Sequence, residues 1–200
     1  MRELLQAARG ARLPLKDYQA DFQQHFWRIG AAGFWKLERQ QTFAEPRSPS
    51  WQAFARGAWD EAMHRLEDQR PEIADYYRRI AEAGFRTKRV RVLAEPLTPY
   101  LRWELQLLRL RSEYGAGMRV VREDQVERFE ESGPLPEVCT LGDEAMYEVR
   151  YDTDGALAGG IRYRDPELIA RCRGFIRDLY DRGEELAAFA DRSGLVPGVR

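Results

Sequence analysis

Residues 88–104, near the middle of the chain, have the sequence KRVRVLAEPLTPYLRWE. The first half of this stretch alternates β-branched Val90 and Val92 with Arg89 and Arg91. A two-residue period of this kind is typical of a strand with one apolar and one polar face. We therefore predict a strand that places both arginines on the same face of a sheet.

The second half of the stretch carries the signals of a helix start. Thr98 can accept a hydrogen bond from a first-turn amide as an N-cap, and the proline that follows suits the first helical position. The helix is expected to end near Tyr114, where Gly-Ala-Gly occupies 115–117, and a strand is expected over 118–122. Strand, helix and strand in succession are typical of a parallel sheet with helices on its faces.

Working outward from this unit, we predict one main domain over residues 32–190. Its class is α/β or α+β, with a mixed sheet of about five to six strands and helices on the sheet faces. The other predicted elements are a strand at 34–39, helices at 50–66 and 71–84, a short helix at 124–131, antiparallel strands within 137–163 and a helix at 166–190.

The two ends of the chain have patterns of their own. Residues 1–31 are predicted to form an N-terminal helical extension, because apolar side chains recur at helical spacing over 14–29. This amphipathic helix packs either on the domain or on a partner chain, so a homodimer through the N-terminal helix is one expectation. Residues 191–200 contain glycine and proline and are expected to form a flexible tail.

Composition excludes several classes of function. The net charge is −1, so no global field draws the chain to nucleic acid or to an acidic membrane, and direct nucleic-acid binding is not expected. No apolar run has the length of a signal peptide or a membrane span. The two cysteines, Cys139 and Cys172, form no metal or redox motif. A cytoplasmic protein without membrane association is the expectation.

No motif for a cofactor or a metal is present. The glycines at 115–117 lie between a helix and a strand, the reverse of the dinucleotide order, and a third glycine is missing. His25 and His64 both lie beside apolar stripes and are predicted to be core or boundary residues. The sequence Asp-Thr-Asp-Gly at 152–155 lacks the later ligands of a calcium loop and predicts a hairpin turn. We therefore expect neither cofactor nor metal.

The charged side chains of residues 88–104 form the candidate site. In α/β sheets, ligands bind beyond the carboxyl ends of strands and near helix N-termini. Guanidinium, phenol, indole and carboxylate groups gathered there can bind a small polar or anionic ligand. The alternative is a network of salt bridges that ties the strand to the helix. The predicted ligand-binding residues are Arg89, Arg91, Glu95, Tyr100, Arg102, Trp103 and Glu104.

Two motifs, FWKLE at 34–38 and RVRVLAEPLTPYLRWEL at 89–105, also support a family resemblance. The chain resembles an uncharacterised actinobacterial domain family whose members often lie near helix-turn-helix regulators. Asp143, the Asp-Gly turn at 154–155 and the helix that begins near Asp165 fit the same pattern. A weaker likeness is to half of a phospholipase D-type domain. The His-x-Lys signature of that family is missing here, so a shared fold would imply a catalytically dead copy.

Three hypotheses for the function follow. The first is a non-enzymatic regulatory or interaction domain, which recognises a partner protein such as a helix-turn-helix regulator, or a small anionic ligand, through the 89–104 segment. The second is a metal-independent biosynthetic enzyme that uses Glu95, Tyr100 or Glu104 as acid and base groups. The third is a degenerate phospholipase D-like nucleic-acid binder.

Overall fold

The computed structural model describes residues 1–195, and the strands of this part form a single sheet. The strands are β1 (Ala11–Pro14), β2 (Phe34–Glu38), β3 (Thr87–Leu93), β4 (Gly117–Arg122), β5 (Val138–Leu141), β6 (Ala145–Tyr151), β7 (Leu157–Tyr163) and β8 (Glu184–Glu185). Their order is β1-β7-β6-β5-β2-β3-β4-β8. Strands β2, β3 and β4 are parallel, and the other neighbouring pairs are antiparallel. The predicted mixed α/β fold is confirmed.

The predicted number of five to six strands is wrong, because the sheet has eight strands within residues 1–195. The two that were missed lie at its edges. β1 has four residues and pairs with β7, while β8 has two residues and pairs with Arg119 and Val120 of β4. Segments this short carry too few residues for a period-two pattern to be read from the sequence.

Eight α-helices accompany the sheet in residues 1–195. They are α1 (Arg2–Ala7), α2 (Leu15–Phe26), α3 (Pro49–Ala55), α4 (Trp59–Asp68), α5 (Arg70–Glu82), α6 (Pro99–Glu113), α7 (Pro166–Arg182) and α8 (Leu186–Arg192). Short 3-10 helices cover Gly30–Ala32, Glu123–Gln125 and Glu127–Phe129, the last two in place of the predicted helix at 124–131.

Two of the predicted long helices are each divided in two by a glycine. The predicted helix at 50–66 is interrupted at Gly57, whose φ of 83° lies in the left-handed region that favours glycine. The predicted helix at 166–190 is interrupted at Gly183, where an added Cβ would lie 2.9 Å from the Cβ of Arg119 on β4. The helix ends at Gly183 because the backbone there is extended, with φ −73° and ψ 150°, and the close approach of β4 leaves no room for a side chain at this position.

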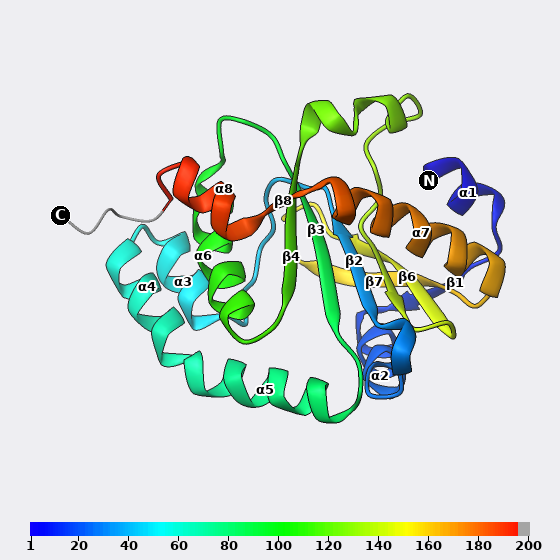
Figure 1. Cartoon of the computed structure of the whole chain (residues 1–200), viewed down its shortest axis with the longest axis horizontal. Coiled ribbons are helices and arrows are strands. Elements are labelled where there is room, and N and C mark those ends of the chain that lie inside the picture. Colours follow the sequence, from blue (N-terminus) through cyan, green and yellow to red (C-terminus); the bar gives the residue numbers. More distant parts are fainter. Residues whose placement is uncertain (196–200) are drawn as a thin grey trace.

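Helices cover the two faces of the sheet differently. α7 packs on one face, where Val90 and Val92 of β3 meet Ile169 and Ile176 in one apolar cluster. In Figure 1, α7 crosses the sheet, α3, α4 and α6 gather at one end of the molecule, and α5 runs from α4 towards α2. On the opposite face, α6 packs over the β3–β4 side and α2 over the side formed by β5, β6 and β7. The middle of that face, over β2 and β3, carries the candidate site.

Both ends of the described chain pack within this fold. Residues 1–31 supply β1 to the sheet and α2 to its face, where Tyr18 and Phe26 are buried. The segment predicted as a flexible tail begins within α8, and its residues 196–200 lie outside the described residues. Within 1–195, no helix combines the length and the apolar character that a bilayer crossing needs.

The predicted start of α6 is confirmed and provides a stability test. Thr98 is the N-cap: its hydroxyl accepts a hydrogen bond from the amide of Leu101 at 3.1 Å and donates one to the carbonyl of Gln41 at 2.8 Å. We expect Thr98→Ala to lower the free energy of unfolding by about 1–2 kcal/mol, measured by urea denaturation. Thr98→Ser keeps the hydroxyl and should lose less than half as much. Equal losses in both variants would show that the hydroxyl is not the stabilising group.

Candidate ligand-binding cleft

Charged side chains occupy the middle of the sheet face that α7 does not cover. In the parallel pairing of β2 with β3, Lys36 is opposite Arg89 and Glu38 is opposite Arg91. Central strands of parallel sheets are normally apolar on both faces. Two like charges directly opposite each other are also destabilising. Such an arrangement in the centre of a sheet favours a functional explanation.

Glu38 neutralises part of this charge. Its Oε1 lies 2.5 Å from Nζ of Lys36, and its Oε2 lies 2.5 Å from Nη1 of Arg89. Burial alone would raise the pKa of Glu38, but the attraction of Arg89 and Lys36 outweighs burial and holds that pKa well below its usual range. Glu38 is therefore ionised at neutral pH. Lys36 and Arg89 share its single negative charge, which leaves one positive charge on the three residues.

A second ion pair lies beside the first. Nε of Arg91 donates to Oε2 of Glu104 at 2.7 Å, and both side chains are almost fully buried. The Tyr100 hydroxyl donates to Oε1 of Glu45 at 2.8 Å and lies 3.3 Å from Oε1 of Glu104. Burial raises the pKa of Glu104, although Arg91 opposes this effect. The predicted salt bridge between strand and helix thus forms through Arg91, whereas Arg89 pairs with Glu38 on β2.

Two adjoining cavities open above these ion pairs. The first has a volume of about 470 Å³ and is bounded mainly by rings from α2 and α5, so we call it the aromatic cavity. The second has a volume of about 570 Å³ and is bounded by aliphatic side chains of α2, α6, β6 and β7, so we call it the aliphatic cavity. Four residues line both: Tyr18, Lys36, Arg89 and Arg111. Together the two cavities form one cleft with cationic groups at their junction.

Arg111, on α6, is the cation of this junction that has no carboxylate partner. It makes no ion pair within the described part of the chain, and it is half-buried. Tyr100, Glu104 and Arg111 follow each other at spacings of four and seven residues, which places them on one side of α6. That side of the helix forms a wall of the cleft.

The seven predicted site residues fall into three groups. Arg89, Tyr100 and Glu104 line the aliphatic cavity. Arg91 lies beside that cavity, with its guanidinium carbon 5.6 Å from the centre of the Phe43 ring. One of its buried nitrogens, Nη2, has no hydrogen-bond partner among the described residues.

The remaining three lie away from the cleft. Trp103 is fully buried in the core beneath α6, where its indole nitrogen donates to the hydroxyl of Ser50 at 2.9 Å. Glu95 and Arg102 are exposed and line neither cavity. Arg102 is two residues from both Tyr100 and Glu104, about half a helical turn, so it points to the other side of α6.

Sequence reasoning missed the cleft residues Lys36, Glu38, Glu45 and Arg111. A signal for two of them was available, because FWKLE at 34–38 alternates apolar and charged residues in the same way as β3. Arg111 could have been found from its spacing to Glu104 on the predicted helix. Glu45 lies in an irregular segment, where no periodicity indicates which way a side chain points.

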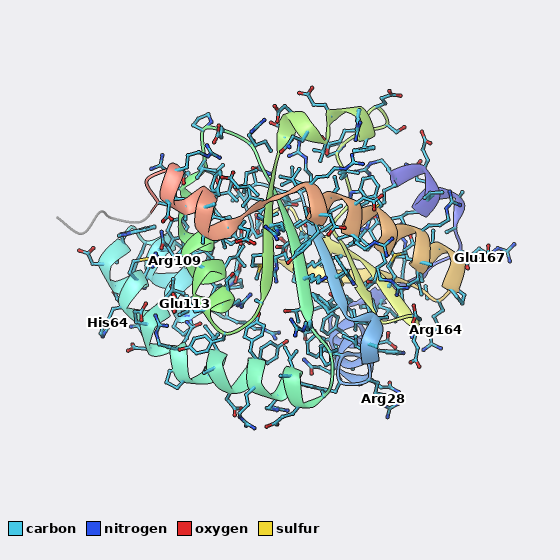
Figure 2. The ribbon with its side chains drawn as sticks, in the orientation of Figure 1. Arg28, His64, Arg109, Glu113, Arg164 and Glu167 are labelled. Carbon is cyan, nitrogen blue, oxygen red and sulfur yellow. The ribbon has the colours of Figure 1, made fainter. Side chains whose placement is uncertain are left out.

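The two histidines lie on different helices. His64 is on α4 with a side chain 78% exposed, so the prediction of a core or boundary position is wrong for it; Figure 2 shows it at the outer margin of the molecule. His25 is on α2, and its Nδ1 is 2.8 Å from the carbonyl oxygen of Asp21. Within residues 1–195, no group of three or more His, Cys, Asp or Glu is placed to hold a metal ion.

A comparison with known families covers most of the chain. Residues 20–191 match the model of DUF6879, a domain of unknown function. The chain belongs to the DUF6879 family. The part that matches DUF6879 contains β2, β3 and α6, which carry the charged residues of the cleft, whereas β1 and Tyr18 precede it. No curated protein matches the sequence.

Proposed function

We propose that this DUF6879 domain is a non-enzymatic binding domain that takes a small anionic ligand in the cleft. The observation that carries the proposal is the excess of positive charge at the cavity junction. Lys36 and Arg89 share the carboxylate of Glu38, and no carboxylate within residues 1–195 pairs with Arg111. Partly desolvated cations attract an anion more strongly than cations in open solvent do.

The cavity volumes support the same proposal. Protein interiors are close-packed, and an ion-pair network that only ties a strand to a helix leaves no need for an opening beside it. Here the two openings measure about 470 and 570 Å³, which is within the usual range of about 300–1,000 Å³ for small-molecule sites. Arginine forks at such a site suit phosphate or carboxylate oxygens.

The proposal extends to a regulatory role. A ligand bound between α2 and α6 would contact both helices and stabilise the arrangement in which both contact it. A partner protein that binds this arrangement more tightly than others would then bind the liganded domain more tightly. The family resemblance supplies the class of partner, a helix-turn-helix regulator. Co-purification of the two proteins with and without the ligand tests this role, and an association that the ligand does not change contradicts it.

A screen with simple anions tests the binding proposal. Inorganic phosphate, pyrophosphate and citrate would be titrated into the protein at low salt by isothermal calorimetry. For the anion that binds most tightly, we expect Arg111→Gln to lower the affinity about tenfold or more, because the substitution removes a charge-assisted hydrogen bond.

The matched control for this screen is Arg109→Gln. Arg109 is on the same helix but lines neither cavity, and Figure 2 shows it towards the outer side of α6. Its substitution should leave the affinity unchanged. A similar loss in both variants, or no binding of any of the three anions to the unmodified protein, would contradict the proposal.

A second candidate, a metal-independent enzyme, is favoured by one observation. The buried Glu104 has a raised pKa, and the Tyr100 hydroxyl lies between it and Glu45 at the wall of the aliphatic cavity. A carboxylic acid next to a phenol can pass a proton to a bound molecule. Chemical conversion of a bound ligand by the unmodified protein, lost in Glu104→Gln, would favour this candidate; unchanged ligand after incubation would favour the binding domain.

A further inference from the structure

We propose that the ligand of the cleft is an amphipathic phosphate monoester, with its dianionic head at Lys36, Arg89 and Arg111 and an apolar tail in the aliphatic cavity. This inference rests on the proposed function and specifies the class of ligand. It depends on the charge at the junction of the two cavities and on the chemistry of the walls on one side of that junction.

The head group is inferred from charge. After Glu38 has compensated one cation of the Lys36–Arg89 pair, one positive charge remains there, and Arg111 adds another. Among the described residues, the other carboxylate that lines the aromatic cavity is that of Glu72, which is exposed, so solvent screens it. A phosphate monoester carries about −1.5 to −2 charges at neutral pH and matches this excess better than a carboxylate does.

The tail is inferred from the walls of the aliphatic cavity. Its apolar side chains come from five separate parts of the fold and face the same space: Leu15, Phe43, Leu107, Leu108, Val149 and Leu157. Of the carboxylates that line it, Glu38 is paired with Lys36 and Arg89, Glu104 is paired with Arg91, and the half-buried Glu45 accepts a hydrogen bond from the Tyr100 hydroxyl. Arg47 and Asp152 also line the cavity but are exposed, so solvent screens their charges. The walls beyond the junction therefore suit a hydrocarbon or ring better than a second anionic group.

The aromatic cavity is less suited to the tail. Its rings already pack against one another. The ring centres of Phe22 and Phe26 are 5.5 Å apart in a stacked arrangement, and those of Phe26 and Phe34 are 5.8 Å apart in an edge-to-face arrangement. Tyr76 at its mouth is among the exposed large apolar side chains of the described residues. Because these rings already contact one another, we place the tail against the aliphatic side chains of the second cavity.

A homologous series of ligands tests the inference. Inorganic phosphate and methyl, butyl, hexyl and octyl phosphate would be titrated by isothermal calorimetry, each below its micelle concentration. Burial of each methylene should raise the affinity about fourfold until the cavity is filled, after which the affinity should level off. The matching alkyl carboxylates should bind about tenfold more weakly at each length, because they carry a single charge.

A cavity-filling variant shows where the tail lies. Leu157→Phe enlarges a half-buried residue of the aliphatic cavity and should reduce the gain in affinity with chain length, while the affinity for inorganic phosphate stays unchanged. Leu97→Phe is the control, since Leu97 is also half-buried but lines neither cavity; it should behave like the unmodified protein.

The outcomes separate this inference from the proposed function. An affinity for alkyl phosphates that does not depend on chain length contradicts the proposed position of the tail. A Leu157→Phe variant in which the affinity still rises fully with chain length contradicts it as well. If the alkyl carboxylates bind as tightly as the alkyl phosphates, the inferred phosphate head group is wrong, but the proposed anion site stands. Absence of binding by every phosphate and carboxylate overturns the proposed function as well.

Discussion

Replacing Arg91 by methionine is expected to lower the free energy of unfolding by about 3–5 kcal/mol. The side chains of Arg91 and Glu104 are 2% and 4% exposed, and Nε of Arg91 lies 2.7 Å from Oε2 of Glu104. This ion pair compensates each of the two charges for its loss of hydration. Methionine preserves much of the apolar volume but leaves Glu104 without its cation. Folding must then bury an unpaired carboxylate or protonate it, and both cost free energy at neutral pH.

Two further variants make this test specific. Arg78 also pairs with two carboxylates, Asp75 and Glu82, but all three side chains are more than half exposed. Arg78→Met should therefore cost less than about 1 kcal/mol. The double variant Arg91→Met/Glu104→Leu buries no charge and should recover most of the lost stability. Urea denaturation at pH 7 measures all three, and a loss for Arg91→Met no larger than that for Arg78→Met would contradict the expectation.

The second large effect is a pH-dependent gain in stability from Glu137→Gln. Glu137 precedes β5, and its Oε1 accepts hydrogen bonds from the amides of Arg39 at 2.7 Å and Gln40 at 2.6 Å. Its Oε2 is buried and has no hydrogen-bond partner in the part of the chain that the structure describes. Burial, reinforced by the negative charge of Glu38, raises the pKa of Glu137 from its ordinary 4.5 to about 7.

The direction of the effect follows from the raised pKa. The folded protein holds this proton more tightly than the unfolded chain, so the stabilising contribution is complete below about pH 4.5 and is lost as the pH rises through about 7. At high pH, the free energy of unfolding is lower by about 3 kcal/mol because this contribution is lost. Glutamine keeps the carbonyl acceptor and never ionises. We therefore expect Glu137→Gln to be about 2 kcal/mol more stable than the unmodified protein at pH 8.5 and nearly equal to it at pH 5.

Urea denaturation from pH 5 to pH 8.5 checks this expectation. Glu82→Gln is the control, because Glu82 is exposed and pairs with Arg78 at the surface. The difference in unfolding free energy between this control and the unmodified protein should not grow as the pH rises. A stability difference for Glu137→Gln that is the same at every pH would show that this carboxyl does not titrate near neutrality.

Local patterns predicted much of the fold. The alternation in β3, the Thr98 cap and the hairpin between β6 and β7 involve neighbours in the chain, and the structure confirms each of them. Edge strands and helix breaks could not be predicted in this way. β8 forms because Gly183 brings the chain close to β4, and the sequence around Gly183 also suits one continuous helix.

The candidate site shows where local pattern stops being informative. The residue types and the alternation on β3 indicate that Arg89 and Arg91 share a face, because that follows from strand geometry alone. Which carboxylate each arginine meets depends on contacts between distant segments. Arg89 pairs with Glu38, 51 residues earlier in the chain, and Arg91 pairs with Glu104 across the strand-to-helix connection.

The alternating patterns on β2 and β3 thus establish a charged face on an otherwise apolar sheet, because period-two geometry needs only neighbouring residues. Long-range packing settles the rest. The gap between α2 and α6 opens the cleft, and the phase of α6 brings Arg111 into it while turning Arg102 away. The position of a helix relative to a sheet is determined by packing contacts among many side chains that are distant in the sequence. A local sequence pattern therefore cannot predict it.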